Sequence, residues 1–202
     1  TEASYGVTDF WIIKLDALGN IVWQNTIGGS SSDDLTSLFE MPDGSFVIGG
    51  SSGSGISGEK TVAGFGSYDY WVIKLSSAGT ITWQKVFGGS SSDELTSLEK
   101  SYDNNILVCG YSSSGISGNK TEISYTADYW ILKLNATGGI IWQNTINGED
   151  VDNCFDIAET YEHNIVITGH SKSMSQYDKE EKFTHESPMA TYYSHFDQND
   201  YD

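Results

Sequence analysis

The sequence predicts an all-β protein, built as a β-propeller-like array of four-stranded antiparallel blades. Closely similar segments begin at Asp9, Asp69 and Asp128, and their first tryptophans lie 60 and then 59 residues apart. Short runs rich in aromatic and β-branched residues recur within each copy, and 22 glycines against 2 prolines suit many tight turns. Self-similarity at this period indicates a repeat architecture, in which each unit buries its apolar face against its neighbours.

The first two runs of each repeat predict a β-hairpin. In the second copy, Tyr70–Leu75 is aromatic, β-branched and too short for a typical helix. Residues 76–80 supply the turn, with Gly79 free to adopt a positive φ, and Gly19 and Gly138 stand in the same place in the other copies. Residues 81–87 alternate apolar and polar side chains, as a half-buried strand does.

The third and fourth runs predict a second hairpin. The third starts at Leu95, the fourth covers residues 106–111, and residues 103–105 turn between them, as residues 42–44 do in the first copy. Because short connections favour antiparallel neighbours, we expect the four runs of one repeat to form one four-stranded sheet. The long segment 112–127 carries a Gly-Ile-Ser-Gly sequence that recurs at 55–58, so we expect an ordered crossover to the next unit.

The repeat boundaries divide the whole chain. Residues 1–8 match the end of a preceding repeat, 9–68 form repeat 1, 69–127 repeat 2, and 128–190 repeat 3 with a degenerate polar crossover. Residues 191–202 read as a worn first strand of a fourth repeat. This start within a repeat and the fourth copy favour a propeller that continues beyond the chain, with further blades from the same or another chain. A β-trefoil, which closes with three four-stranded repeats, is the alternative.

Charge excludes several classes of partner. The chain carries 28 acidic residues and 10 basic ones, all lysine, for a net charge of −18. Nucleic acid and anionic membranes require cationic patches, so neither is an expected partner. No apolar run approaches 18 residues, so we expect no membrane insertion.

Cys109 and Cys154 occupy non-equivalent positions in different repeats and are interpreted as small buried apolar residues, with a disulfide or metal pair as the alternative.

The repeated motif resembles a known group of repeats. The pattern DYWVIKLxxxGxIxWQKxxGGSSSDE, followed by GYSSSGISGxKTE, is similar to the tandem propeller-like repeats of large secreted Bacteroidetes proteins, which the type IX system exports. The likeness covers nearly all of residues 1–170. It implies export, an extracellular or cell-surface location and calcium-tolerant blades, and it implies no defined activity. The usual Thr-x-Asp-Gly-Gly-Tyr of these repeats is replaced here by residues 41–46, MPDGSF.

Six tryptophans, two per repeat, are the strongest energetic feature. Burying each one removes roughly 150–250 Å² from water, and we expect them to pack between blades. The alternative is that exposed indole rings stack on sugars. The residues concerned are Trp11, Trp23, Trp71, Trp83, Trp130 and Trp142.

Paired carboxylates follow the second run of each repeat and are the candidate binding residues. Solvated or turn-capping carboxylates, calcium ligands and glycan contacts are the three interpretations, with calcium considered at Asp33, Asp93 and Asp152. Their recurrence argues against catalysis, because a catalytic pair is normally unique. The full set is Asp33, Asp34, Asp93, Glu94, Glu149, Asp150 and Asp152.

These observations predict a non-catalytic scaffold of a secreted or surface-displayed protein, which binds glycan or an extracellular protein. No cofactor is required, and calcium is the one candidate ion. A glycan-active propeller enzyme and a ligand-free spacer are the alternatives. No Gly-x-Ser-x-Gly elbow or nucleotide-binding glycine loop occurs in the sequence.

Overall fold

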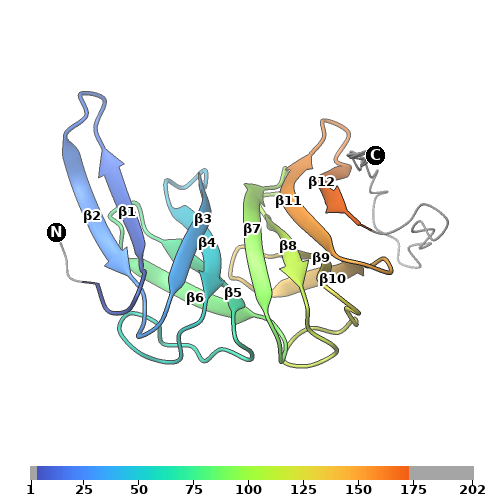
Figure 1. Cartoon of the computed structure of the whole chain (residues 1–202). Coiled ribbons are helices and arrows are strands. Elements are labelled where there is room, and N and C mark those ends of the chain that lie inside the picture. Colours follow the sequence, from blue (N-terminus) through green and yellow to red (C-terminus); the bar gives the residue numbers. More distant parts are fainter. Residues whose placement is uncertain (1–3, 173–202) are drawn as a thin grey trace, which may run out of the picture.

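The computed structural model describes residues 4–172, which form twelve β-strands in four antiparallel sheets and contain no helix (Figure 1). The first sheet pairs β1 (Phe10–Leu15) with β2 (Ile21–Ile27). The second has the order β3 (Asp33–Glu40), β4 (Phe46–Ser52), β5 (Asp69–Leu75), β6 (Ile81–Phe87). The third has the order β7 (Asp93–Lys100), β8 (Ile106–Ser112), β9 (Asp128–Leu134), β10 (Ile140–Ile146), and the fourth pairs β11 (Asp152–Glu159) with β12 (Ile165–Ser171). These described residues include no helix that could cross a membrane.

The four sheets stand side by side, with an apolar layer in each gap (Figure 1). Phe10 and Trp71 meet between the first and second sheets, and Tyr70 and Trp130 meet between the second and third. A third layer, which includes Ile131 and Ile157, joins the third and fourth sheets. Residues alternate along β5 between the two layers, so both faces of an interior sheet are buried.

The hairpin turns confirm the expectation that a glycine adopts a positive φ in the first hairpin of each repeat. Gly19, Gly79 and Gly138 have φ between 79° and 85°, in the left-handed region that glycine adopts without a steric penalty. The second hairpin of each repeat also needs a positive φ, and Gly44, Asn104 and His163 provide it. The asparagine is a common non-glycine choice for this region.

The expected composition of each sheet is wrong. The four runs of one repeat do not form one sheet, because the chain changes sheets after the second run. A complete sheet joins the third and fourth runs of one repeat to the first and second runs of the next, as β3–β4–β5–β6 shows. The structural unit is therefore offset by half a repeat from the sequence unit.

The long loops and the short connections have the opposite roles to those expected from the sequence. The long loops 53–68 and 113–127 return the chain to the same sheet, so that Ser52 lies opposite Asp69 and Ser112 opposite Asp128. The short Gly-Gly-Ser-Ser-Ser segments, 28–32 and 88–92, cross to the next sheet instead. These crossovers are held by parallel contacts rather than by a hairpin, and the Asp33 amide donates to the Thr8 carbonyl at 2.9 Å. The expectation that the long loops are ordered holds, since they pack on the crossovers.

The predicted repeat boundaries beyond residue 172 concern residues outside the described part of the chain. These are the degenerate crossover, up to residue 190, and the worn strand, 191–202.

Candidate functional site: a buried Asp–Ser–Lys network and an adjacent groove

A buried polar network joins each crossover to the long loop that covers it. We call Asp33, Ser52, Ser54 and Lys60 the Asp–Ser–Lys network of the second sheet. The Asp33 carboxylate is 1% exposed and accepts hydrogen bonds from the Ser52 hydroxyl, from Ser54 Oγ at 2.8 Å and from the Gly29 amide at 2.7 Å. The carboxylate thus fixes the loop and the crossover at once.

Lys60 completes this network from the long loop. Its ammonium donates to Ser52 Oγ at 2.6 Å and to the Ser54 carbonyl at 2.7 Å, and lies 5.3 Å from the centre of the Trp71 ring. The lysine is fully buried. Buried charges are tolerated in proteins when they are paired and hydrogen-bonded, and the nearby Asp33 and Asp69 supply the opposite charge.

The third sheet repeats the network with one change. Asp93 accepts from the Ser112 hydroxyl, from Ser114 Oγ at 2.9 Å and from the Gly89 amide at 2.7 Å. Lys120 donates to Thr145 Oγ1 at 2.6 Å, and its ammonium lies 4.8 Å from the Trp130 ring centre. A chemical arrangement that recurs from sheet to sheet is typical of structural support.

Serine side chains of the long loops also bind the crossover backbone. The Ser30 amide donates to Ser57 Oγ at 2.8 Å, and the Ser90 amide donates to Ser117 Oγ at the same distance. These contacts explain why Gly-Gly-Ser-Ser-Ser and Gly-Ile-Ser-Gly recur together in the first two repeats. Each motif satisfies backbone groups of the other.

Burial shifts the ionisation of the network. It lowers the pKa of Lys60, and it lowers the pKa of Lys120 to about 8, although Asp93, Glu122 and Asp128 oppose the shift. Burial likewise raises the pKa of Asp69 and of Asp128, against amide hydrogen bonds such as that from Phe65 to Asp69 at 2.8 Å.

We predict a pH signature for Lys120. Its pKa is lower in the folded chain than in the unfolded chain, so between about pH 8 and 10 the unfolded state binds more protons and the contribution of Lys120 to stability rises with pH. The free energy of unfolding of the native protein, minus that of Lys120→Met, should therefore increase from pH 8 to pH 9.5, with a slope of at most ~1.4 kcal/mol per pH unit. Urea unfolding at several pH values measures this difference. A flat or falling difference would contradict the assignment.

The structure separates the paired carboxylates that the sequence placed together. Because neighbouring strand residues face opposite sides, Asp33 is buried in the network while Asp34 is exposed and accepts from Thr8 Oγ1 at 3.0 Å. Asp93 is likewise buried, while Glu94 is only partly buried and accepts from Ser92 Oγ at 3.2 Å.

In the third copy the same division occurs. Asp152 is buried, whereas Glu149 and Asp150 are exposed. Within residues 4–172, no group of three or more His, Cys, Asp or Glu side chains is placed to hold a metal ion. Calcium binding at Asp33, Asp93 and Asp152 stays a prediction. Asp33 and Asp93 accept hydroxyl and amide donors in the network.

The six tryptophans occupy three kinds of position. Trp71 and Trp130 are completely buried between sheets. Trp23 and Trp83 are partly buried, and their indole N–H groups donate to the Ser77 carbonyl at 3.1 Å and the Ala136 carbonyl at 3.2 Å in the next sheet. Trp142 packs partly against the third layer. Trp11, the first-copy equivalent of Trp71, is 57% exposed because none of the described sheets covers the outer face of β1.

The two cysteines come closer than their sequence positions suggested. Cys109 on β8 and Cys154 on β11 are both buried in the layer between the third and fourth sheets. Burial, with a further contribution from neighbouring Cys109, raises the pKa of the Cys154 thiol. Both are free thiols and act as small apolar residues in this layer.

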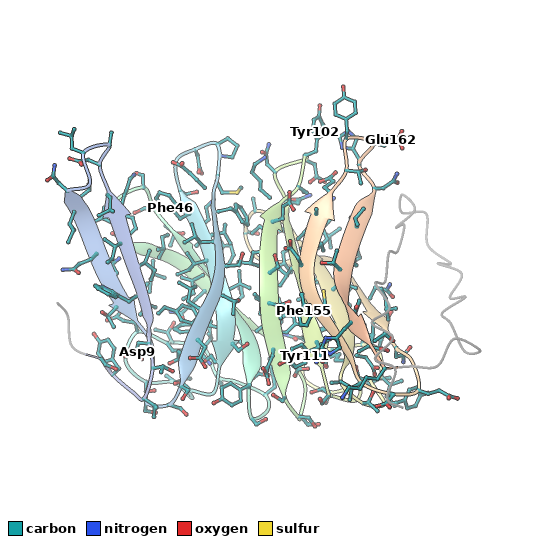
Figure 2. All side chains as sticks on the ribbon, turned by 45° about the horizontal axis from the view of Figure 1, so that its top comes forward. Asp9, Phe46, Tyr102, Tyr111, Phe155 and Glu162 are labelled. Atoms are coloured by element: carbon teal, nitrogen blue, oxygen red, sulfur yellow. The ribbon has the colours of Figure 1, made fainter. Side chains whose placement is uncertain are left out.

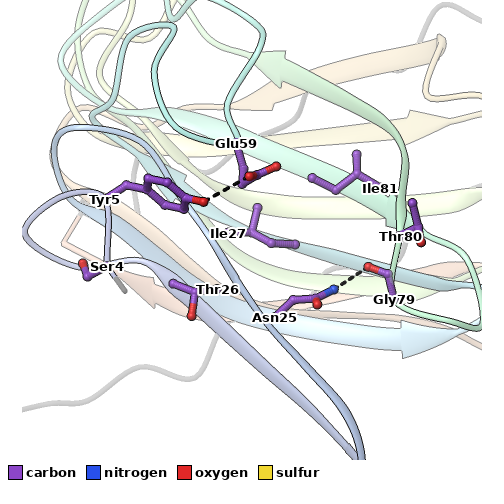
Figure 3. Close-up of a pocket in the computed structure, with 9 residues that line it drawn as sticks. All are labelled: Ser4, Tyr5, Asn25, Thr26, Ile27, Glu59, Gly79, Thr80 and Ile81. Carbon is purple, nitrogen blue, oxygen red and sulfur yellow. Dashed lines mark hydrogen bonds between the residues drawn. The ribbon is translucent and has the colours of Figure 1, made fainter. Parts of the chain in front are cut away.

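A groove of about 680 Å³ lies beside the crossover between the first and second sheets (Figure 3). Tyr5 and Glu59 meet at one side, where the tyrosine hydroxyl donates to Glu59 Oε1 at 3.1 Å. Asn25 on β2 donates to the Gly79 carbonyl at the other side. The remaining lining is Ser4, Thr26, Ile27, Thr80 and Ile81.

Sequence reasoning did not identify this groove. The available signal was a difference between repeats, Glu59 in the first against Asn119 in the second. The Asn119 side chain accepts from the Gly88 amide at 2.9 Å and donates to the Val86 carbonyl at 2.9 Å, so its polar atoms are used inside the fold. Glu59 instead turns its carboxylate to the tyrosine at the groove.

The chain matches no protein-family model and no curated protein. Among solved structures, it is similar to a crystal structure of a protein of unknown function from Bacteroides caccae, with a TM-score of 0.49 and 13% sequence identity. The similarity covers 82% of this chain and 48% of that one, so the chain spans about half the length of the protein it matches.

Proposed function

We propose that the chain is part of a β-propeller and acts as a non-catalytic binding scaffold for glycan or an extracellular protein. The face-to-face stacking of four-stranded sheets supports a propeller over a β-trefoil. β3, β7 and β11 lie next to one another along one edge of the stack, as strands around an axis do. Ser37 Oγ donates to the Leu98 carbonyl at 3.3 Å, and Ser97 Oγ to Asp156 Oδ1 at 2.7 Å, along this edge.

The hydrogen bonds made by the buried charged side chains support a non-catalytic role. Asp33 and Asp93 each accept three hydrogen bonds that hold loops, and Lys60 and Lys120 donate within the same layers. Groups engaged in this way hold the fold rather than face a substrate. A glycan-active enzyme, the alternative from another class, requires carboxylates that reach the substrate.

The groove of Figure 3 is the observation that carries the binding proposal. It combines the ring of Tyr5 with the carboxylate of Glu59, the amide of Asn25 and the threonine hydroxyls, beside apolar Ile27 and Ile81. Ligand sites typically join apolar walls to a few convergent polar groups, and sugars offer hydroxyls to such groups. We therefore place glycan contact at this groove rather than at the paired carboxylates.

An extracellular or cell-surface location is part of the same proposal. It is supported by the resemblance of the repeats to those of exported Bacteroidetes proteins. The net charge of −18 is compatible with it, because strongly acidic surfaces keep proteins soluble and attract cations.

A glycan array probed with the full chain tests this proposal. We expect binding to a subset of glycans, weakened about tenfold or more (~1.4 kcal/mol) in Tyr5→Ala and Glu59→Gln. Matched controls are Tyr161→Ala and Glu162→Gln, in the exposed turn between β11 and β12, which should bind like the native protein. Figure 2 shows Glu162 at the opposite end of the molecule from Asp9.

Three other results would contradict it. Equal binding by all four variants would show that the groove does not bind the glycan. Absence of binding to any glycan or extracellular protein would favour the ligand-free spacer. Time-dependent release of reducing sugar would favour the enzyme.

A further inference from the structure

The two end sheets are complementary halves of one sheet. β1–β2 corresponds in sequence to β5–β6 and β9–β10, which form the second half of each complete sheet. β11–β12 corresponds to β3–β4 and β7–β8, which form the first half. The N-terminal sheet therefore lacks the half that the C-terminal sheet contains, and the reverse also holds.

An exposed apolar face marks the missing neighbour of the N-terminal half. Trp11 is 57% exposed, while its equivalents Trp71 and Trp130 are 0% exposed. On β3, Leu38 is 56% exposed, while its equivalent Leu98 is 5% exposed. These residues lie on two neighbouring surfaces, the outer face of β1–β2 and the side of β3 toward the first sheet, which together we call the N-terminal face: Trp11, Ile13, Leu15 and Ile21 on the first sheet, and Leu38 on the second.

The chain cannot cover this face with its own C-terminal half. β1–β2 and β11–β12 lie at opposite ends of the stack, with both complete sheets between them (Figure 1). None of the described strands of the chain completes the β1–β2 sheet. A second copy of this chain presents strands of the required sequence type, β11 and β12, and the edge of β12 is not paired to any described strand. In the proposed pair, β1 of the second copy would occupy the position beside β12 that the sequence assigned to residues 191–202.

We propose that two copies associate head to tail, with β12 of each pairing antiparallel to β1 of the other. The register follows from the two complete sheets. Ser52 lies opposite Asp69 and Ser112 opposite Asp128, so Ser171 should lie opposite Asp9 of the second copy. Likewise Gly50 lies opposite Trp71 and Gly110 opposite Trp130, which places Gly169 opposite Trp11.

Tryptophan hydrogen bonds extend the same pattern. Trp23 and Trp83 donate to a carbonyl in the hairpin turn of the following sheet, at Ser77 and Ala136. In the pair, the equivalent donor is Trp142 of one copy and the equivalent acceptor is the Ala17 carbonyl of the other. The N-terminal face would then be covered by the third sheet and β11–β12 of the second copy, as Trp71 is covered now.

Two copies suffice to close the assembly. Each chain contributes two complete sheets, and its two half-sheets complete two further sheets with its partner, so the pair has six. Closed propellers have about four to eight blades. A head-to-tail contact that closes gives a discrete ring, whereas one that does not gives a filament. The inference rests on the sheet halves and does not depend on glycan binding.

The acidity of the chain sets a condition for assembly. Each copy carries a net charge of −18, so two copies repel each other at low ionic strength. Salt screens this repulsion while leaving apolar contacts in place. Association should therefore strengthen as the salt concentration rises.

Light scattering after size exclusion, with the full chain at several concentrations and salt levels, tests the proposal. We expect a species of twice the 22.1 kDa chain mass, favoured by salt. Ile13→Lys and Leu38→Lys should weaken the pair about tenfold or more, because each buries a charge in place of an apolar side chain. Ile56→Lys and Ile116→Lys, at exposed positions of the long loops, should leave it unchanged.

Cysteine cross-linking tests the register itself. Val47 lies opposite Lys74 and Leu107 opposite Lys133, so Val166 should lie opposite Lys14 of the second copy. Directly opposed residues have Cα atoms about 4.5–5.5 Å apart, within disulfide range. With oxidised glutathione as oxidant, Lys14→Cys/Val166→Cys should form a covalent dimer. Lys14→Cys/His170→Cys, four residues out of register, should not.

Each other outcome overturns the proposal. A 22.1 kDa monomer at every concentration and salt level excludes the second copy as the occupant. A ladder of larger species excludes a closed pair. Equal cross-linking of the two cysteine pairs excludes the register. Circular dichroism of each variant shows whether it has folded.

Discussion

Replacement of Trp71 or Trp130 by alanine is expected to lower the free energy of unfolding by about 3–5 kcal/mol. Both indoles are completely buried between sheets, against Phe10 at 5.1 Å and Tyr70 at 4.9 Å between ring centroids. Each also lies under a buried ammonium, from Lys60 or Lys120. Removing the ring leaves a cavity and deprives that lysine of its cation–π contact. Urea unfolding followed by circular dichroism measures the change.

The first copy provides a matched control. Trp11→Ala, measured at a concentration where the chain is monomeric, should cost at most about 1 kcal/mol, because more than half of its surface already meets water. Equal losses at Trp11 and Trp71 would show that sheet-to-sheet burial does not determine the stability of this fold.

Asp33→Ala is the second substitution with a large expected effect, about 3–5 kcal/mol. The change removes the acceptor for the Ser52 and Ser54 hydroxyls and the Gly29 amide. It also takes one of the two nearby negative charges away from buried Lys60, leaving Asp69. A buried donor without an acceptor costs its full desolvation free energy, so the long loop and the crossover should loosen together.

The adjacent residue is the control for this prediction. Asp34→Ala removes the same group one position along β3, but Asp34 is exposed, so the cost should stay within about 0.5 kcal/mol. The double variant Asp33→Ala/Lys60→Met should be less destabilised than the sum of its single changes, because the lysine charge is removed as well. Additive losses, or equal losses at positions 33 and 34, would contradict the network.

Local features of the fold were predictable from the sequence. The strands of β5 and β6 were placed within one residue, since their alternation and the glycine of their turn depend on neighbouring residues alone. The third strand was expected from Leu95 and begins at Asp93. Its first residue, Asp93, is polar and is held in place by the buried network.

The pairing of the hairpins was not predictable in the same way. Each hairpin bears the same local signals whether it joins the hairpin before it or the one after it. The choice depends on contacts between distant segments, such as Ser52 opposite Asp69 across the long loop. A short connection suggested a turn within one sheet, yet Gly28–Ser32 leaves the sheet because serines of the long loop bind its amides.

The candidate site was also predictable from the sequence only in part. Carboxylates could be found by composition, but their division into buried Asp33 and exposed Asp34 follows from the strand that begins there. No feature of the sequence indicated that Lys60 is buried, since lysine is ordinarily exposed. The groove at Tyr5 and Glu59 depends on residues 54 positions apart that only the folded chain brings together.

The sequence by itself determined the all-β class, the repeat period and the glycine-dependent hairpins, because periodicity and turn chemistry act over a few neighbouring residues. The tertiary structure decided which hairpins share a sheet, which acidic residues are buried, and which apolar faces are left exposed at the ends. These depend on the free energy of packing one sheet against another, and that free energy is shared between segments far apart in the chain.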